Sequence, residues 1–377
     1  MAGATTARTA SPEAPAPGYH ARVNQPSETP TELPNLAAIV APAPGLFTVF
    51  AVTRQIRRAQ TRTGKPYFEL KLSDRTRTMG AKIWSDALRA MQSAEEILVG
   101  THVKLLFEIE NYQGVAQLNV RGIRPVRDDE PGYDAQSLVE EGMHLVEDLL
   151  CSTLVFDIET VPGIDLRRAP SSIAQAVTKQ AERNEWDHGK VMSLSPYFGR
   201  VVSLAVGDGE QDPRTQEVTV FVVPPDGAPL KADKATHWIR PVSEADLLRA
   251  FWTLAGQAEV VVSYNGRGFD VPFLIGRSLV HRVPARVDLL SNRYSLRPHL
   301  DLCQVLATGR GGTSLDVVCW ALGLASPKEE MDGSMVATAY AKGDLASIAL
   351  YNAGDVRATT AVYQRVRDDL LRYRSDW

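Results

Sequence analysis

The apolar positions between residues 45 and 127 repeat with the two-residue period of half-buried β-strands. Three runs show this period in succession, Leu46–Arg54, Pro66–Ser73 and Thr78–Trp84, the last reading "TMGAKIW". The stretch "SDALRAMQSAEEIL" then changes to helical spacing, with Ser85 as the expected N-cap. Two further strands, "HVKLLFEIE" and "AQLNVRGIRPV", meet at the turn "NYQG". The pattern predicts a small all-β domain that contains one helix.

A second set of elements begins at Thr153 and predicts an α/β domain over residues 151–377. The runs "TLVFDIETVPG", "RVVSLAVGD" and "EVTVFVVPP" read as three strands of an antiparallel meander. The helix "SEADLLRAFWTLAG" follows with a capping box of Ser243 and Asp246, and the strand "EVVVSYNG" then leads to a helix that begins near Asp270. This βββαβα order, with acids at strand and helix ends, predicts a ribonuclease-H-like domain with a mixed five-stranded sheet flanked by helices.

Two segments lie outside these domains. Residues 1–44 are rich in Pro, Ala, Thr and Ser and poor in large apolar side chains. We expect them to form a disordered tail, because they bury too little surface to offset chain entropy. Residues 128–150 are charged and turn-rich before they become helical. We expect the linker between the two domains there.

Composition and charge narrow the classes of function. The chain has 377 residues, 44% of them hydrophobic, which is enough for two domains with substantial cores. Its net charge of −4 argues against a uniformly basic coat but leaves local basic patches open. Cys151, Cys303 and Cys319 lack the spacing of metal or redox motifs. No window approaches the ~18 apolar residues of a membrane span, so we expect a cytoplasmic protein without a membrane partner.

The first domain concentrates basic and aromatic residues in one turn. Three strands, a helix and two strands are the layout of an OB barrel. Such barrels stack bases of a single strand on aromatic rings while cations follow its backbone. The candidate contacts lie in "RRAQTRTGKPYFEL" and are Arg57, Arg58, Arg62, Lys65, Tyr67 and Phe68. The alternative is that both rings are ordinary strand residues and the basic tip is only solvated.

The stretch "TGKPYFELKLSD" in the first domain resembles the OB domains that are fused to bacterial exonucleases and those of some tRNA-binding proteins. The resemblance implies a small OB barrel that binds nucleic acid and precedes the α/β domain.

Two carboxylates interrupt the first strand of the second domain. Asp157 and Glu159 are two residues apart and therefore share one face of the strand. Their repulsion would raise a pKa unless a cation lay between them, and no Lys or Arg is adjacent. A divalent metal is favoured, because hard cations select carboxylate oxygen. A D-x-E pair by itself is more often a turn or capping feature than a catalytic one, so further acids are needed to support a metal site.

Three motifs resemble those of DEDD-type 3′-5′ exonucleases, in the tyrosine-bearing DEDDy subclass that includes the proofreading domain of family-B DNA polymerases. They are "FDIET", "SYNGRGFDVPFL" and "YNAGDVRATTAVY", in the same order as in that family. The resemblance covers the chain from Thr153 to Val366. The stretches "VVSYNGRGFDVPFL", "HLDL" and "DGSMV" further resemble a stand-alone bacterial group related to that proofreading domain.

The resemblance implies a site for two divalent metal ions, Mg²⁺ or Mn²⁺. Asp157 would bridge the ions, and Asp270 would hold the second of them. Glu159 and Asp355 would complete the ion that activates water, and Tyr351 would position the nucleophile. Two such ions stabilise the attacking and the leaving oxygen of a phosphoryl displacement.

The spacing of the third motif agrees with this assignment. Tyr351 and Asp355 are four residues apart on a helix predicted over Leu345–Leu371, so both lie on one face of that helix. The alternative for Tyr351 is a core tyrosine, because aromatic residues at helical spacing most often belong to a core.

Further candidates lie in and beside the second motif. Asn265 would hydrogen-bond the terminal nucleotide or brace the loop. Arg267 would contact phosphate or remain solvated, and Phe269 would stack on a terminal base or pack. For His299 and Asp301 in "HLDL", one alternative is a role in binding metal or substrate. A structural hydrogen-bond pair is favoured for them, because the acidic site already has four carboxylates.

These features predict a metal-dependent 3′-5′ exonuclease that degrades single-stranded nucleic acid to nucleoside monophosphates, with the OB domain gripping the strand. DNA 3′ ends are slightly favoured because the motifs resemble polymerase proofreading domains, and an exoribonuclease stays open. The alternative from another class is a non-catalytic strand-binding or adaptor protein. We expect no polymerase or helicase domain to fit in this chain, so any proofreading would serve a separate protein partner.

Overall fold

A computed structural model describes residues 29–112, 115–127, 129–225, 237–291, 295–307, 312–326, 333–375 and 377. The strands are β1 Thr31–Glu32, β2 Ala43–Gln60, β3 Pro66–Ser73, β4 Thr78–Trp84, β5 His102–Tyr112, β6 Val115–Pro125, β7 Thr153–Pro162, β8 Gly199–Asp208, β9 Val218–Val222, β10 Ile239–Pro241, β11 Val260–Ser263 and β12 His299–Asp301. The α-helices are α1 Leu88–Glu96, α2 Met143–Val146, α3 Ser171–Asn184, α4 His188–Ser193, α5 Glu244–Gln257, α6 Asp270–His281, α7 Leu302–Val305, α8 Leu315–Leu322, α9 Val336–Ala341 and α10 Leu345–Asp369. The 3₁₀ turns are η1 Leu36–Ala38, η2 Ala135–Leu138, η3 Glu147–Leu149 and η5 Leu371–Tyr373.

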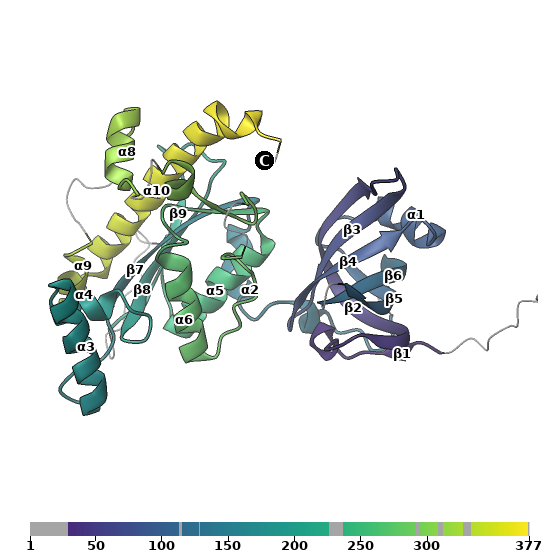
Figure 1. Ribbon diagram of the computed structural model, residues 1–377, viewed down its shortest axis with the longest axis horizontal. Coiled ribbons are helices and arrows are strands. Elements are labelled where there is room, and N and C mark those ends of the chain that lie inside the picture. The colour runs from purple at the N-terminus through teal and green to yellow at the C-terminus, as the bar shows by residue number, and fades with distance from the viewer. Residues whose placement is uncertain are drawn as a thin grey trace, which may run out of the picture.

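The first lobe is a closed β-barrel built from β2 to β6 (Figure 1). Strands β2, β3 and β4 pair in antiparallel order, β4 pairs with β6 in parallel, and β5 returns to β2. The long β2 pairs with β5 along its first half and with β3 along its second, with a bulge between Thr53 and Gln55. Leu70, Ile83 and Phe107 fill the interior. The predicted strands are confirmed, although β2 is longer than expected, and positions 113 and 114 of the predicted hairpin turn lie outside the described residues.

The prediction of a disordered tail over residues 1–44 is wrong for residues 29–44. Strand β1 pairs in parallel with β2. Leu36 and Ile39 are buried in the barrel core. The backbone N–H of Leu36 donates to the buried carboxylate of Asp74 at 2.5 Å. Two apolar side chains and one hydrogen bond order this segment despite its composition, and residues 1–28 lie outside the described part of the chain.

The expected N-cap of the barrel helix is also wrong. Helix α1 begins at Leu88, after Ala87, and no side chain caps it. Strand β4 runs through Trp84, and the Ala87 N–H donates to the Trp84 carbonyl at 3.0 Å. The turn out of the strand therefore uses the residues around Ser85 and shifts the N-cap by two residues, from Ser85 to Ala87.

The second lobe is built on a mixed six-stranded sheet with the order β10-β9-β8-β7-β11-β12. The meander of β7, β8 and β9 is antiparallel, as predicted, while β11 pairs in parallel with β7 and β12. The sheet has six described strands rather than the expected five. Strands β10 and β12 have three residues each, which is too short for a periodic pattern to fix their number from the sequence. A mixed sheet with flanking helices fits the expected ribonuclease-H-like fold.

Helices cover both faces of this sheet (Figure 1). Leu154, Phe156 and Ile158 point from β7 into a core shared with α5 and α6. Val155 and Val161 alternate with them and point into a second core shared with α8, α9 and α10. Residues 157 and 159 have the same parity as 155 and 161, so their side chains lie on the α10 face of the sheet.

Local signals explain the flanking helices. The Ser243 side chain caps α5 by accepting from the Asp246 N–H at 3.1 Å, as predicted. Helices α3 and α4 are inserted between β7 and β8.

Among the helices in the described ranges, none combines the length and the apolar character that crossing a bilayer requires.

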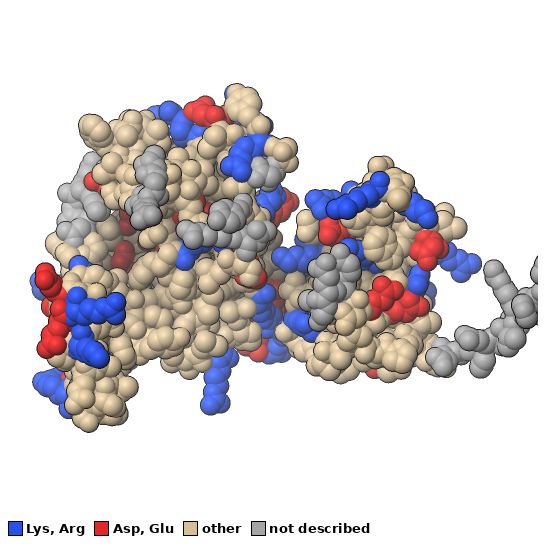
Figure 2. All heavy atoms as spheres, viewed as in Figure 1, with Lys and Arg blue, Asp and Glu red and all other residues tan. Residues whose placement is uncertain are grey.

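The barrel contacts both the second lobe and the connecting residues 129–150. Arg54 on β2 donates to the Gln257 side chain at 2.6 Å and lies 3.6 Å from the Glu140 carboxylate. Arg75 pairs with Glu141 at 3.0 Å. The residues predicted as a linker thus supply acidic partners at the junction, and a groove with Lys and Arg on its walls separates the lobes beside these contacts (Figure 2).

Candidate metal and nucleic-acid site

Strand β7 carries two acids beyond the end of its neighbour β11. Strand β11 pairs with β7 only along Thr153–Val155, whereas β8 follows β7 as far as Pro162. Asp157 and Glu159 were expected at the end of the strand, but they lie inside it, and a bulge follows Glu159. The sheet opens on one side of β7 at this point and leaves room for other elements to approach.

Helices α10 and α6 bring two further carboxylates to this opening. Asp157, Glu159 and Asp355 each offer a carboxylate oxygen, and these atoms lie within 4.8 Å of one another. Asp270, in the first turn of α6, is buried, and its Oδ1 accepts from the Ile158 N–H at 3.3 Å. The four acids of the three motifs, far apart in the sequence, are thus gathered around β7.

The electrostatics of this cluster are unfavourable without a cation. Burial raises the pKa of Asp157 well above its ordinary value, and the charges of Asp270, Asp355 and Glu159 raise it further. The pKa of Glu159 is raised by burial and then by Asp355 and Asp270. Burial raises the pKa of Asp270 to about 7. Among the described residues, no Lys or Arg pairs with Asp157, Glu159 or Asp270, so this set of hard oxygen donors fits divalent cations.

Tyr351 lies one helical turn before Asp355. Its ring packs against the core beneath α10, so the packing role weighed for it holds in part. Burial raises the pKa of its phenol, and Asp355, Glu159 and Asp157 raise it further. A side-chain hydrogen bond with Asp355 favours the same protonated form. The hydroxyl therefore keeps its proton at neutral pH and faces the carboxylates.

A buried polar contact lies within the apolar face of helix α10 near the acids. The buried Asn352 donates from Nδ2 to the Ser203 Oγ on β8 at 2.9 Å. Ala349, Ala353 and Val356 are fully buried around it. Small side chains at helical spacing let the helix lie close to the sheet, which sets the position of Asp355.

The loop of the second motif is tightly folded. Asn265 has a φ of 62°, and its backbone N–H donates to Asp301 Oδ1 at 2.9 Å. A Cβ on Gly266 would lie 2.2 Å from the Ser263 Oγ, and one on Gly268 would lie 2.5 Å from the Asn265 Oδ1. Glycine is required at both positions by the close approach of these atoms.

Two of the predicted nucleic-acid contacts of this loop brace the structure. The Arg267 guanidinium donates to the carbonyls of Leu290 at 3.1 Å and His299 at 3.0 Å. Phe269 packs on Phe273 with ring centroids 5.6 Å apart. Asn265 is exposed at the tip of the loop. Of these three residues, Asn265 keeps its side chain most accessible to a nucleotide.

His299 and Asp301 have separate structural contacts. The His299 Nδ1 donates to the Leu289 carbonyl at 3.0 Å, so Nε2 accepts from the Ser263 hydroxyl at 2.7 Å. Burial lowers the pKa of His299 to about 4, which keeps the ring neutral. Asp301 accepts the N–H groups of Asn265 and, at 3.0 Å, Arg267. Asp301 thus shapes the second-motif loop, and neither residue belongs to the carboxylate group described above.

The outer face of the barrel carries an aromatic pair that sequence reasoning found only in part. Tyr67 on β3 lies opposite Trp84 on β4, with ring centroids 5.0 Å apart. The Lys82 ammonium lies 5.8 Å from the Tyr67 ring centroid and 5.3 Å from that of Trp84. Trp84 and Lys82 were missed, although the alternation in "AKIW" places both on the outer face.

The prediction for the basic turn is correct for some of its residues and wrong for others. Phe68 is only 6% exposed and belongs to the barrel core, so its predicted stacking role is wrong, because successive strand residues face opposite sides. Arg57 pairs with Glu69 at 2.6 Å and Arg58 with Glu95 at 3.3 Å, both on the surface. Arg62 and Lys65 are exposed at the tip of the turn.

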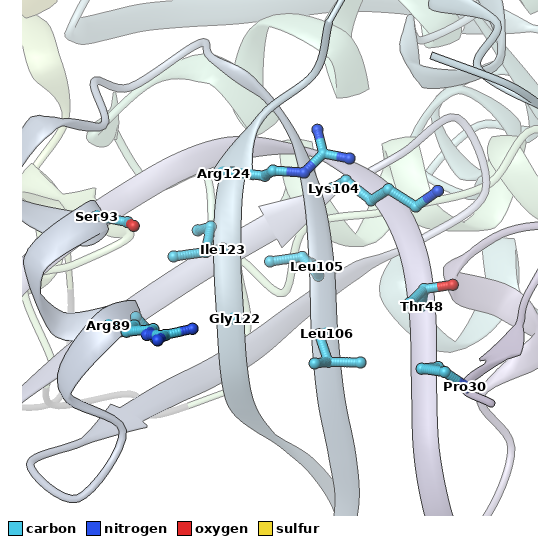
Figure 3. Close-up of a pocket in the computed structure, with 11 residues that line it drawn as sticks. Pro30, Thr48, Arg89, Ser93, Lys104, Leu105, Leu106, Gly122, Ile123 and Arg124 are labelled. Atoms are coloured by element: carbon cyan, nitrogen blue, oxygen red, sulfur yellow. The ribbon is translucent and has the colours of Figure 1, made fainter. Parts of the chain in front are cut away.

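A separate pocket of about 480 Å³ opens between α1 and strands β5 and β6 (Figure 3). Leu105, Leu106 and Ile123 form its apolar floor, and Lys104 and Arg124 lie at one end. Both cations pair with Glu130, at 3.0 and 2.7 Å. Glu32 also lies 3.8 Å from Lys104, so two carboxylates offset the two cations, and this pocket adds little to a strand-binding surface.

The carboxyl-terminal part of the chain matches a known family. Residues 200–371 match the model of a family described as "Predicted 3'-5' exonuclease related to the exonuclease domain of PolB". The match covers less than half of the chain, from β8 to the end of α10, and so includes Asp270, Tyr351 and Asp355 but not Asp157 or Glu159. No curated protein matches the sequence.

Three solved structures are similar to the chain in part. The family B DNA polymerase from the hyperthermophilic archaeon Pyrobaculum calidifontis is 15% identical over 85% of this chain and 46% of that chain, with a TM-score of 0.39. A Replication Protein A heterotrimer bound to ssDNA is 26% identical over 22% of this chain and 59% of that chain, with a TM-score of 0.19. The S. cerevisiae mitochondrial single-stranded DNA binding protein Rim1 is 11% identical over 22% of this chain and 96% of that chain, with a TM-score of 0.20. The chain spans less than two thirds of the length of the first two.

Proposed function

We propose that this enzyme, in which residues 200–371 form a 3′-5′ exonuclease domain related to that of PolB, degrades single-stranded nucleic acid to nucleoside monophosphates. The observation that carries the proposal is the meeting of Asp157, Glu159 and Asp355 within 4.8 Å, with Asp270 beside them. The presence of all four acids and the tyrosine counts against a non-catalytic adaptor.

The carboxylates are suited to hold two divalent ions, Mg²⁺ or Mn²⁺. Bound ions of this kind polarise a phosphodiester and stabilise the charge that develops on its oxygens. Asp157 lies with Glu159 and Asp355 inside the 4.8 Å group, and the neighbouring Ile158 N–H donates to Asp270, so Asp157 is close to all three other acids. We assign Asp157, Glu159, Asp270 and Asp355 as metal ligands of a DEDDy-type site.

Tyr351 and the second-motif loop complete the proposed site. The Tyr351 hydroxyl retains its proton and donates a hydrogen bond at the edge of the carboxylate group, which suits it to orient a water molecule for attack on phosphorus. The exposed Asn265, held by Asp301, is placed to contact the terminal nucleotide. Arg267 and Phe269 then act as positioning residues that keep the loop in shape.

The barrel is proposed to be an OB domain that grips the strand. Its closed order of strands, with β4 and β6 parallel and β5 returned to β2, supports this assignment. Tyr67 and Trp84 offer two ring faces to stacked bases, and Lys82 lies beside them. Arg62 and Lys65 are available at the tip of the turn for phosphate contacts.

The substrate is proposed to be DNA, on the strength of the motifs shared with polymerase proofreading domains. An exoribonuclease is the second candidate. The described residues include no side chain whose position distinguishes a 2′-hydroxyl from a hydrogen.

The test uses 5′-labelled single-stranded DNA and RNA of one sequence, incubated with the full chain and Mg²⁺ or Mn²⁺. We expect a ladder shortened from the 3′ end, and Asp157→Ala is expected to lower its rate by at least ~1000-fold. The matched control Glu182→Ala removes an exposed carboxylate from α3 and is expected to leave the rate unchanged. The absence of shortening on either strand, or equal rates for Asp157→Ala and wild type, would contradict the enzymatic proposal.

A further inference from the structure

A groove of about 400 Å³ lies at the junction between the barrel and the exonuclease lobe. The outer face of β3 and β4 forms one wall, with Lys71 and Gly80. The chain between α6 and β12 forms the other, with Arg286, Asp288 and Arg297. Lys and Arg side chains are visible on both sides of the gap between the lobes (Figure 2).

The cations of this groove lack sufficient acidic partners. The Arg286 Nη1 is buried and has no hydrogen-bond partner in the described parts of the chain. Burial lowers the pKa of Lys71, and the positive charge of Arg54 lowers it further. No carboxylate among the described residues forms an ion pair with Lys71. The nearby Glu140 lies 3.6 Å from Arg54, and the positive charges of Arg54 and Arg286 both act on it. This one carboxylate is shared between two cations while Lys71 has none, so the junction keeps an excess of positive charge.

The acidic groups at the rim do not remove this excess. Arg297 lies 3.8 Å from Glu259, but both side chains are largely exposed and this pair is screened by solvent. Asp288 uses its Oδ1 to accept the backbone N–H groups of Leu290, at 3.1 Å, and Ser291, at 2.8 Å. An unpartnered buried guanidinium N–H is costly, so it favours an anionic ligand that approaches from the groove.

The groove connects the two sites already described. Lys71 and Tyr67 are four residues apart on β3 and share its outer face, and Gly80 lies opposite Lys71 as Trp84 lies opposite Tyr67. On the other wall, the Leu290 carbonyl accepts from Arg267 of the second-motif loop. The aromatic pair therefore borders one side of the groove and the loop that follows β11 borders the other.

We propose that this junction groove binds the phosphodiester backbone of the single strand between the Tyr67–Trp84 pair and the carboxylate site. The inference rests on the proposed function and identifies how its substrate is held across the two lobes. The Arg286 fork matches phosphate oxygens and would satisfy its free Nη1. Gly80 leaves open space, because a Cβ there would meet no atom within 4 Å.

The test measures binding of a 5′-fluorescein-labelled oligodeoxynucleotide, long enough to reach from the barrel to the carboxylates, to the full chain in EDTA. For Lys71→Ala combined with Arg286→Ala we expect about ten-fold weaker binding at low salt. The slope of log Kd against log salt concentration should fall by about 1.4, because each lost contact to a single strand contributes ~0.7. The matched control is Lys179→Ala with Arg183→Ala, which removes two exposed cations from α3 and should leave Kd unchanged.

Gly80→Glu provides a second variant that leaves the junction contacts of both lobes intact. It adds a carboxylate to the groove without a clash and should also weaken binding of the long strand. Unchanged affinity in both groove variants, or an equal loss in the α3 control, would overturn the groove proposal. Cleavage of a labelled trinucleotide with Mn²⁺ reports on the carboxylate site alone. If the groove variants cleave the trinucleotide at the wild-type rate and also bind the long strand with wild-type affinity, the groove proposal is rejected and the exonuclease proposal stands.

Discussion

At the residue scale, single side chains combine packing with a polar role at the site. Tyr351 packs its ring on the core and turns its hydroxyl to the carboxylates. Arg267 braces the second-motif loop through two carbonyls, although its charge and position in the sequence indicated a phosphate contact. A residue in a motif can therefore serve the site by shaping it.

The Tyr351 hydroxyl is expected to contribute to turnover and little to folding. Tyr351→Phe should lower kcat by about 100-fold with KM nearly unchanged, because the hydrogen bond that orients the nucleophile is lost. Steady-state rates on single-stranded DNA measure both constants. Tyr363→Phe is the control on the same helix, since its hydroxyl bonds Glu210 outside the site and its loss should leave kcat unaltered. Equal kcat values for Tyr351→Phe and wild type would reduce Tyr351 to a packing residue.

Gly266 is expected to tolerate no side chain. In Gly266→Ala the added Cβ would lie 2.2 Å from the Ser263 Oγ, so the second-motif loop must shift. We expect a loss of about 1–3 kcal/mol in the free energy of unfolding and a lower cleavage rate. Gly80→Ala, where a Cβ meets nothing within 4 Å, is the control and should change the free energy of unfolding little. Denaturant unfolding and the cleavage assay report the two effects, and wild-type values for Gly266→Ala would contradict this geometry.

At the scale of elements, one buried ion pair ties α5, α6 and β8 together. Glu244, at the start of α5, accepts from Arg277 of α6 at 2.7 and 2.8 Å and from the Val201 N–H of β8 at 2.9 Å. Glu244 is 6% exposed and Arg277 is 9% exposed. Because Asp270 begins α6, this contact also helps to set the position of a candidate metal ligand.

Glu244→Ala is expected to destabilise the second lobe strongly. The change leaves the Arg277 charge buried without its partner, and we expect a loss of about 3 kcal/mol in the free energy of unfolding. The surface pair of Arg365 and Asp369 provides the control, because Asp369→Ala should cost no more than ~0.5 kcal/mol. Denaturant unfolding measures both losses. Similar losses for the two variants would show that Glu244 is not a tie between the elements.

At the scale of the whole molecule, the site gathers Asp157, Glu159 and Asp270, for which the described residues provide no ion pair. Asp157, Glu159 and Asp270 have raised pKa values, whereas in the unfolded chain such groups titrate near ~4. Between these pKa values the folded chain keeps protons that the unfolded chain releases, so stability falls as pH rises.

The metal-free protein is therefore expected to lose thermal stability between about pH 5 and pH 8. Mn²⁺ should restore Tm at pH 8, because it binds the ionised carboxylates of the folded chain. Asp157→Asn removes part of the repulsion and should reduce the fall, while Glu182→Gln on the exposed face of α3 should not. Thermal unfolding in EDTA at several pH values provides the measurement. A Tm that is flat with pH, or that Mn²⁺ leaves unchanged, would contradict a metal site at these acids.

The aromatic pair of the barrel is expected to control affinity for long strands. Tyr67→Ala combined with Trp84→Ala should weaken binding of single-stranded DNA by about 10- to 100-fold, because base stacking contributes ~1–3 kcal/mol per base. Fluorescence anisotropy with the full chain measures the loss. Tyr373→Ala removes an exposed ring near the C-terminus and is the control. Wild-type affinity in the double variant would leave the barrel without a stacking role.

Sequence reasoning failed where distant residues or weak patterns decided the outcome. Leu36 and Ile39 order a segment whose composition indicated disorder, because they enter the barrel core. Strands β10 and β12 have too few residues for a visible period. Phe68 was placed on the surface with its neighbour Tyr67, although strand alternation directs it inward.

The sequence by itself determined the longer strands and their succession along the chain, the long helix α10, and the placement of acids in three motifs. These are consequences of spacing between near neighbours, which hydrophobic period and helical geometry express locally. Only the tertiary structure decided that Asp355 and Asp270 meet Asp157, that Trp84 pairs with Tyr67, and that Lys71 and Arg286 share a groove. Strand register and the packing of helices on the sheet bring these residues together, and neither is encoded in the separation of residues along the chain.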